Sequence, residues 1–61
     1  MKPLKEGSDI WFDVWQNEDG WSYRIEKRGN RWTAWDAHGF RTKEAAEAIM
    51  NEKLKAIAKV V

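Results

Sequence analysis

Hydrophobic and polar positions alternate with a period of two in two neighbouring segments of the chain. Residues 10–15 read IWFDVW and residues 21–26 read WSYRIE, so alternate side chains of each segment form an apolar side. Such alternation is typical of β-strands that bury one face. Asp19 and Gly20 lie between the segments, and an Asp-Gly pair favours a type I′ turn because both central positions need positive φ. The sequence therefore predicts an antiparallel hairpin.

A third strand is predicted after a second tight turn. Residues 28–31 read RGNR, which favours a turn, and residues 32–36 read WTAWD, with the aromatic and β-branched side chains typical of a strand. Three strands joined by short turns form an antiparallel meander.

After residues 37–40 the apolar positions recur with helical spacing. Thr42 suits an N-cap because its hydroxyl can accept a hydrogen bond from a free backbone N–H, and Glu44 lies near the positive end of the helix dipole. The apolar side of this helix carries Ala46, Ile49, Met50, Leu54, Ile57, Val60 and Val61. We expect an α+β fold in which a three-stranded antiparallel β-meander packs on one C-terminal α-helix (β-β-β-α). It should form a single domain over residues 10–61, behind a flexible leader of residues 1–9.

The predicted helix is longer than the predicted strands. At 1.5 Å per residue, a helix over residues 43–61 is about 28 Å long. Strands of about six or seven residues span only ~20–23 Å. The last helical turns should extend past the sheet and expose Leu54, Ile57, Val60 or Val61, unless a second copy covers them or the end of the helix frays. A homodimer through the C-terminal helix is therefore a possible partner arrangement.

A single helix can cover only one side of the sheet, so the other side should face solvent. The alternation assigns to the covered side Ile10, Phe12, Val14, Trp21, Tyr23, Ile25, Trp32 and Ala34. The uncovered side combines indole and guanidinium groups. Its candidate DNA-binding or partner-binding residues are Trp11, Trp15, Arg24, Arg28, Arg31, Thr33 and Trp35.

Three interpretations of this side are open. Stacked tryptophans and arginines can be purely structural, each pair contributing about 0.5–1 kcal/mol. Arginines on a sheet can bind phosphates and guanine edges of DNA, and tryptophan and arginine are also enriched in protein–protein hot spots. Asp13 and Glu26 lie on the same side and repel phosphate unless a neighbouring arginine pairs with them.

Composition disfavours catalysis. The chain has no cysteine, His38 is its single histidine, and no nucleophile, base and orienting group fall into a recognisable set. We expect a protein that is not an enzyme and that uses no cofactor and no metal. No apolar run approaches the ~20 residues of a membrane span, and the start lacks a signal peptide, so a cytoplasmic protein without a membrane partner is expected.

Charge is unevenly distributed along the chain. The net charge is +1, but residues 1–20 carry −3 and residues 21–35 carry +3. The middle of the chain is therefore locally basic, which favours a nucleic-acid partner for the predicted second and third strands.

Residues 39–48 read GFRTKEAAEA, in which a glycine, an aromatic residue and a threonine lead into an alanine-rich and glutamate-rich helix. This motif follows the predicted three-stranded sheet. In that position the chain resembles the N-terminal arm-DNA-binding domain of phage and transposon tyrosine integrases. The three-strand-plus-helix plan is also similar to plant ethylene-response-factor domains. The resemblance covers roughly residues 20–53. It implies that the sheet enters the DNA major groove and that contacts come from Arg24, Arg28, Arg31, Trp32 and Trp35. The alternation buries Trp32, so we exclude it from the candidate contacts.

The sequence departs from the integrase pattern in its acidic first strand, its few sheet lysines and the absence of the core-binding and catalytic domains, so recombinase activity is not expected. A resemblance to small bacterial domains with the same element order implies instead a homodimer without chemistry. Binding of double-stranded DNA through the sheet is the first hypothesis. The alternative is a protein-interaction module, such as a phage or mobile-element accessory protein that binds a host protein or self-associates.

Overall fold

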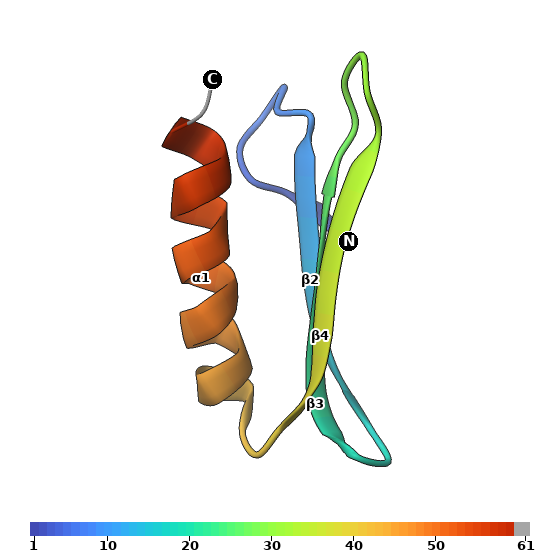
Figure 1. Cartoon of the computed structure of the whole chain (residues 1–61), viewed down its shortest axis with the longest axis vertical. Coiled ribbons are helices and arrows are strands. Elements are labelled where there is room, and N and C mark those ends of the chain that lie inside the picture. Colours follow the sequence, from blue (N-terminus) through green and yellow to red (C-terminus); the bar gives the residue numbers. More distant parts are fainter. Residues whose placement is uncertain (60–61) are drawn as a thin grey trace.

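The computed structural model describes residues 1–59 and has an antiparallel sheet with a helix packed on one face (Figure 1). The strands are ordered β1-β2-β3-β4, so each strand lies beside the next one in the chain. The elements are β1 (Lys2–Pro3), β2 (Ile10–Asn17), β3 (Gly20–Lys27), β4 (Thr33–Phe40) and α1 (Lys43–Lys59). The predicted α+β class and the meander followed by a C-terminal helix are confirmed.

The sheet has four strands, so the prediction of three was wrong. The additional strand β1 comes from the expected leader and pairs with β2, with Lys2 opposite Phe12 and Pro3 opposite Trp11. The backbone N–H of Leu4 also donates to the carbonyl of Ile10 at 2.8 Å. Otherwise β2 would be an edge strand with unpaired backbone groups. A strand of two residues, one of them proline, has no alternation by which the sequence could reveal it.

The hairpin between β2 and β3 is present, but its turn differs from the predicted type I′. Asn17 pairs with Gly20, which leaves Glu18 and Asp19 as the loop residues. Within the described chain, positive φ occurs only at glycines, so Glu18 and Asp19 do not adopt the type I′ geometry. Gly20 has φ of 124°, and a Cβ there would lie 2.5 Å from the carbonyl oxygen of Phe40. Glycine is therefore required at this position both by conformation and by space.

A bulge in β4 returns Phe40 to the helix side of the sheet. Tyr23 pairs with Ala37 and Trp21 pairs with Phe40. A step of two residues along β3 therefore corresponds to a step of three residues along β4. The extra residue is accommodated beside Gly39, whose φ is 86°. Phe40 consequently lies 5.8 Å from Tyr23, centroid to centroid, and closes the core where the chain turns into the helix.

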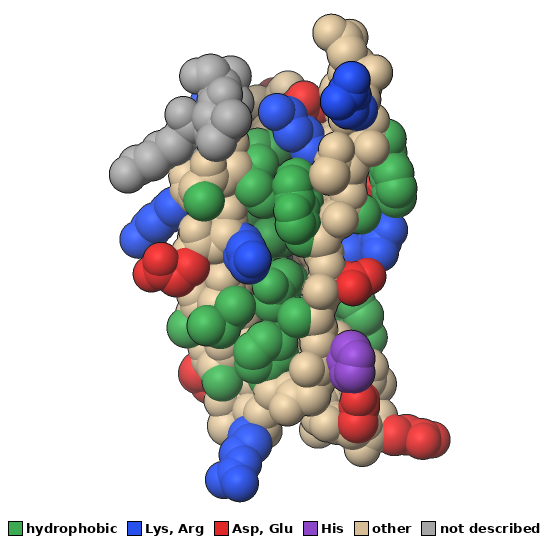
Figure 2. All heavy atoms as spheres, viewed as in Figure 1, with side chains coloured by type: hydrophobic (Ala, Val, Ile, Leu, Met, Phe, Trp, Pro, Cys, Tyr) green, Lys and Arg blue, Asp and Glu red, His purple; other side chains and the backbone are tan. Residues whose placement is uncertain are grey.

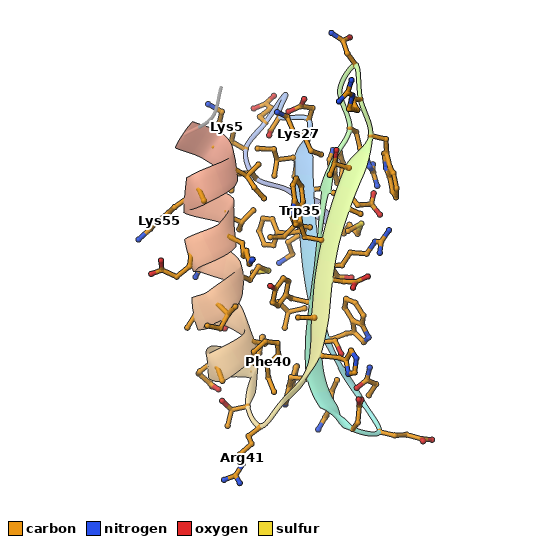
Figure 3. All side chains as sticks on the ribbon, viewed as in Figure 1. Lys5, Lys27, Trp35, Phe40, Arg41 and Lys55 are labelled. Atoms are coloured by element: carbon orange, nitrogen blue, oxygen red, sulfur yellow. The ribbon has the colours of Figure 1, made fainter. Side chains whose placement is uncertain are left out.

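The predicted alternation of the third strand was wrong by one residue. Lys27 pairs with Thr33 and Ile25 pairs with Trp35, so Thr33 and Trp35 face the helix and not the uncovered side. Trp35 packs against the core, and it points into the layer between α1 and the sheet (Figure 3). Trp32, assigned to the core from its sequence position, is 59% exposed. Because side chains alternate along a strand, a shift of one residue moves each of them to the other face.

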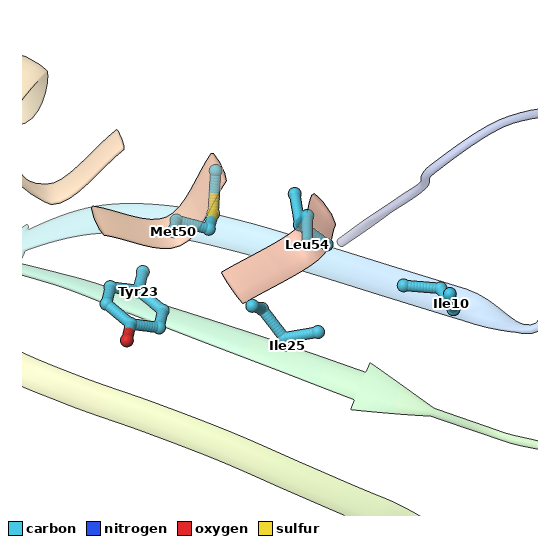
Figure 4. Packing of buried hydrophobic residues seen from close by; sticks show 5 residues of the cluster. All are labelled: Ile10, Tyr23, Ile25, Met50 and Leu54. Carbon is cyan, nitrogen blue, oxygen red and sulfur yellow. The ribbon is translucent and has the colours of Figure 1, made fainter. Parts of the chain in front are cut away.

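The core lies between the inner strands β2 and β3 and the helix α1. Its buried members are Ile10, Tyr23, Ile25, Met50 and Leu54 (Figure 4). Thr42 caps α1 as predicted, since its Oγ1 accepts a hydrogen bond from the backbone N–H of Ala45 at 3.0 Å. No helix in residues 1–59 is long and apolar enough to cross a membrane.

The expected exposure of the C-terminal half of the helix is not found for Leu54, which is buried. Ile57 packs against the core, and Leu4 and Leu54 line the same shallow hollow, so the leader lies beside this end of α1. Ile49, predicted on the buried side, is 44% exposed instead. Val60 and Val61 lie outside the described residues.

Ile25 has 0% exposure and is the residue most sensitive to a loss of volume. We expect Ile25→Val to lower the free energy of unfolding by about 1 kcal/mol, because the removed methyl group leaves a small cavity. The same change at the exposed Ile49 should lower it by less than about 0.5 kcal/mol. Denaturant unfolding of both variants measures the difference, and equal losses would contradict the placement of Ile25 at the centre of the core.

Candidate functional site

The side of the sheet that faces away from α1 forms a continuous surface, here called the open face. Cross-strand pairing brings Asp13 of β2 beside Arg24 of β3, and Arg24 beside Asp36 of β4. The same alternation of side chains along each strand identifies the other residues on this side of the sheet. The open face consists of Trp11, Asp13 and Trp15 of β2, Ser22, Arg24 and Glu26 of β3, Ala34, Asp36 and His38 of β4, and the flanking Arg28 and Trp32.

A network of ion pairs crosses the centre of this face. Glu26 accepts a hydrogen bond from Arg24 at 3.0 Å and another from Arg28 at 2.9 Å, and its side chain is 13% exposed. Arg24 also donates to Asp36 at 3.0 Å, which joins β3 to β4. The hydrogen bonds from Arg24 and then from Arg28 lower the pKa of Glu26, and they outweigh the opposing effect of desolvation. Glu26 is therefore ionised and held between two guanidinium groups at neutral pH.

The two arginines of the network also stack on tryptophans. The guanidinium carbon of Arg28 lies 4.7 Å from the ring centroid of Trp11, and that of Arg24 lies 5.7 Å from the ring centroid of Trp32. Both distances are within the range of cation–π attraction. Each arginine is thus held by carboxylate and ring together, so the polar groups of the open face are fixed before any partner arrives.

Two indoles remain accessible at the margins of the network. Trp15 is 39% exposed and Trp32 is 59% exposed. Next to Trp15 lies a hollow of about 260 Å³, which Arg24, Asp36 and His38 also line. His38 lies on β4, where its Nδ1 is 2.9 Å from Oδ2 of Asp19 in the hairpin turn. The hollow thus combines an aromatic wall with hydrogen-bonding groups.

The open face unites four of the seven residues predicted for the site, namely Trp11, Trp15, Arg24 and Arg28. Arg31 lies in the loop between β3 and β4, and Thr33 and Trp35 face the helix. Sequence reasoning missed Asp36 and His38, and it wrongly excluded Trp32 as buried. Trp32 and Trp35 are three positions apart, so the alternation always places one on each face, and only the length of the preceding loop decides which.

The arrangement offers contacts but little chemistry. Ser22, the hydroxyl nearest the hollow, is buried, and its Oγ is engaged with the Asn17 side-chain amide at 3.0 Å. Within residues 1–59 no three histidine or acidic side chains are grouped closely enough to hold a metal ion. The groups that the open face offers are therefore indole rings and hydrogen-bonding side chains.

Comparison of this chain with protein-family models, with curated proteins and with solved structures finds no match.

The ion pairs of Glu26 predict a pH-dependent contribution to stability. Because the folded-state pKa lies below the ordinary value of 4.5, ionised Glu26 stabilises the fold above that pH, and this contribution is lost as the pH falls through the lowered pKa. We expect Glu26→Gln to unfold at lower denaturant concentration than the wild type at neutral pH. The gap should close as the pH falls below 4.5 and through the lowered pKa of Glu26.

The matched control is Glu52→Gln, the same change at an exposed position of α1. It should alter the free energy of unfolding at neutral pH by less than about 0.5 kcal/mol. Denaturant titrations across the acidic range measure both variants. A difference between Glu26→Gln and wild type that does not change with pH would show that the network does not hold an ionised carboxylate.

Proposed function

We propose that this domain is a non-enzymatic binding module that uses its open face to recognise a protein partner. The observation that carries this proposal is the combination of two exposed indoles, Trp15 and Trp32, with arginines whose charge is already balanced by carboxylates. Tryptophan and arginine dominate the binding energy of many protein interfaces, especially beside a pocket that excludes water.

Preorganisation supports this proposal. Arg24 is held by Glu26, Asp36 and the ring of Trp32, so little side-chain entropy remains to be lost when it meets a partner. The backbone beneath is a paired sheet, which is more rigid than a loop. A partner side chain that enters the hollow beside Trp15 would gain aromatic contact and find Asp36 and His38 within reach for hydrogen bonds.

Charge favours a protein over double-stranded DNA as the partner. Arg24 and Arg28 would have to leave Glu26 and Asp36 to bind phosphates or guanine edges. Asp13 adds a further negative charge to the same face, so its carboxylates outnumber its guanidinium groups. DNA binding, as the integrase resemblance implies, would then rely on Arg31 in the adjacent loop, and a single cation releases few counterions.

Self-association through the helix has weaker support than binding through the open face. With Leu54 buried, Ile49 is the large hydrophobic residue that α1 exposes within residues 1–59. One exposed isoleucine is a small part of the surface that a stable interface buries.

Loss of the accessible indoles should abolish partner binding. We expect the double variant Trp15→Ala, Trp32→Ala to reduce capture of proteins from a cell extract about tenfold or more, because interface hot spots contribute about 2 kcal/mol or more. Retention by the wild type should persist in high salt, since the contact is mainly aromatic and its ion pairs are internal. Quantitative mass spectrometry of the retained proteins measures the change.

The control is Ile49→Ala, which removes an exposed hydrophobic side chain on the opposite side of the molecule and should leave capture unchanged. A parallel titration with labelled duplex DNA at low ionic strength tests the competing hypothesis. DNA affinity that falls steeply with salt and is lost in Arg31→Ala would overturn the proposal in favour of nucleic acid.

A further inference from the structure

The two edges of the sheet are protected to different degrees. At one edge, β1 is two residues long and includes Pro3, features that discourage pairing with another strand. At the other edge, β4 has eight residues, and its sequence TAWDAHGF contains neither proline nor lysine. Within residues 1–59 no strand pairs with its outer side. The bulge at Gly39 interrupts only the end of β4, so residues 33–37 offer a regular edge for pairing.

A groove runs beside this edge on the helix side, on the opposite side of the sheet from the open face. It has a volume of about 450 Å³, with Trp35 and Ile57 as its main apolar walls, and Lys27, Thr33, Lys53 and Ala56 complete its lining. Figure 2 shows hydrophobic side chains gathered between the helix and the edge strand, and Figure 3 shows Trp35 directed into this layer. An edge strand and an apolar groove thus lie side by side.

The groove carries positive charge. Lys27 and Lys53 line it from the strand side and the helix side, and neither pairs with a carboxylate within residues 1–59. The adjoining hollow adds Arg31. Among the described residues that line the two hollows, Asp9 is the sole acid. Acidic side chains on an incoming segment would therefore meet cations on both sides of the groove.

We propose that β4 and this groove bind an extended peptide, added to the sheet as a further strand, in which hydrophobic and acidic residues take turns at every second position and so lie on the same face. The backbone of the peptide would pair with residues 33–37, which is the mode of recognition known as β-augmentation. A hydrophobic side chain would enter the groove against Trp35 and Ile57, and the carboxylates two positions before and after it, on the same face of the strand, would face Lys27 and Lys53.

A second copy of the chain fits the groove less well. Pairing of β4 with another β4 would present Thr33, Trp35 and Ala37 on the groove side, with no acidic residue among them. It would also bring two sets of Lys27 and Lys53 to the same edge, and like charges repel. An acidic peptide would balance the charges of Lys27 and Lys53, whereas a second copy would double the number of lysines at this edge.

The test uses a short peptide with blocked ends, in which leucine and aspartate take turns at every second position and serine fills the positions between them, added to the isotope-labelled protein. Amide shifts should concentrate on residues 33–37 and on helical residues 53–57. A peptide N-methylated on alternate amides loses its backbone donors and should bind about tenfold more weakly. The same peptide with lysine in place of each aspartate should not bind.

Lys53→Glu should raise the dissociation constant about tenfold, because an attraction becomes a repulsion. Lys55→Glu, the same change on the helix surface directed away from the sheet (Figure 3), should change it less than about twofold. Trp15→Ala should leave the dissociation constant of the peptide unchanged. Failure of peptide binding at β4 is therefore distinguishable from failure of the open-face proposal. Equal binding of the lysine peptide, or shifts on the open face, would overturn the inference. Self-association of the protein that produces the same shifts on β4 would show that a second copy binds this edge. That result would also overturn the inference.

Discussion

The structure depends on the alternation of side chains along the central strand β3. Tyr23 and Ile25 point to the helix and form the middle of the core, whereas Arg24 and Glu26, their chain neighbours, point to the open face. Because pairs on both sides of β3 are in fixed register, this single strand determines which residues of β2 and β4 are buried and which are displayed. A change of register would place an arginine in the core, so the arrangement of the open face is as strongly specified as the core itself.

The same constraint explains how a sheet with one exposed side is stabilised. One helix cannot cover both faces, and the open face is instead closed partly by its own side chains. Arg24 and Arg28 spread over Trp32 and Trp11 while Glu26 joins the two guanidinium groups. Structural and binding roles are therefore not exclusive, because the contacts that stabilise the sheet also position the groups that a partner would meet.

Most of the fold could be predicted from local signals in the sequence. The register of β4 could not. The Asp19-Gly20 hairpin and the Thr42 cap depend on near neighbours, and both the hairpin and the cap are present. The short strand β1 has no pattern of its own and forms only because β2 supplies a partner. The faces of Trp32 and Trp35 were exchanged because the loop before β4 is one residue longer than its turn sequence suggests. Four of the seven predicted site residues thus lie on the open face, and the part of that face on β4 required the structure.

Charge shows most clearly why position in space matters more than position in the chain. The net +3 of residues 21–35 favoured a DNA partner, yet Arg24 is neutralised partly by Asp36, which lies outside that segment. Lys27, in the same segment, faces the other side of the sheet. The basic middle of the sequence is therefore divided by β3 into a balanced aromatic face and a cationic groove. Two surfaces of such different character would select different partners, and neither character is visible in the linear count of charges.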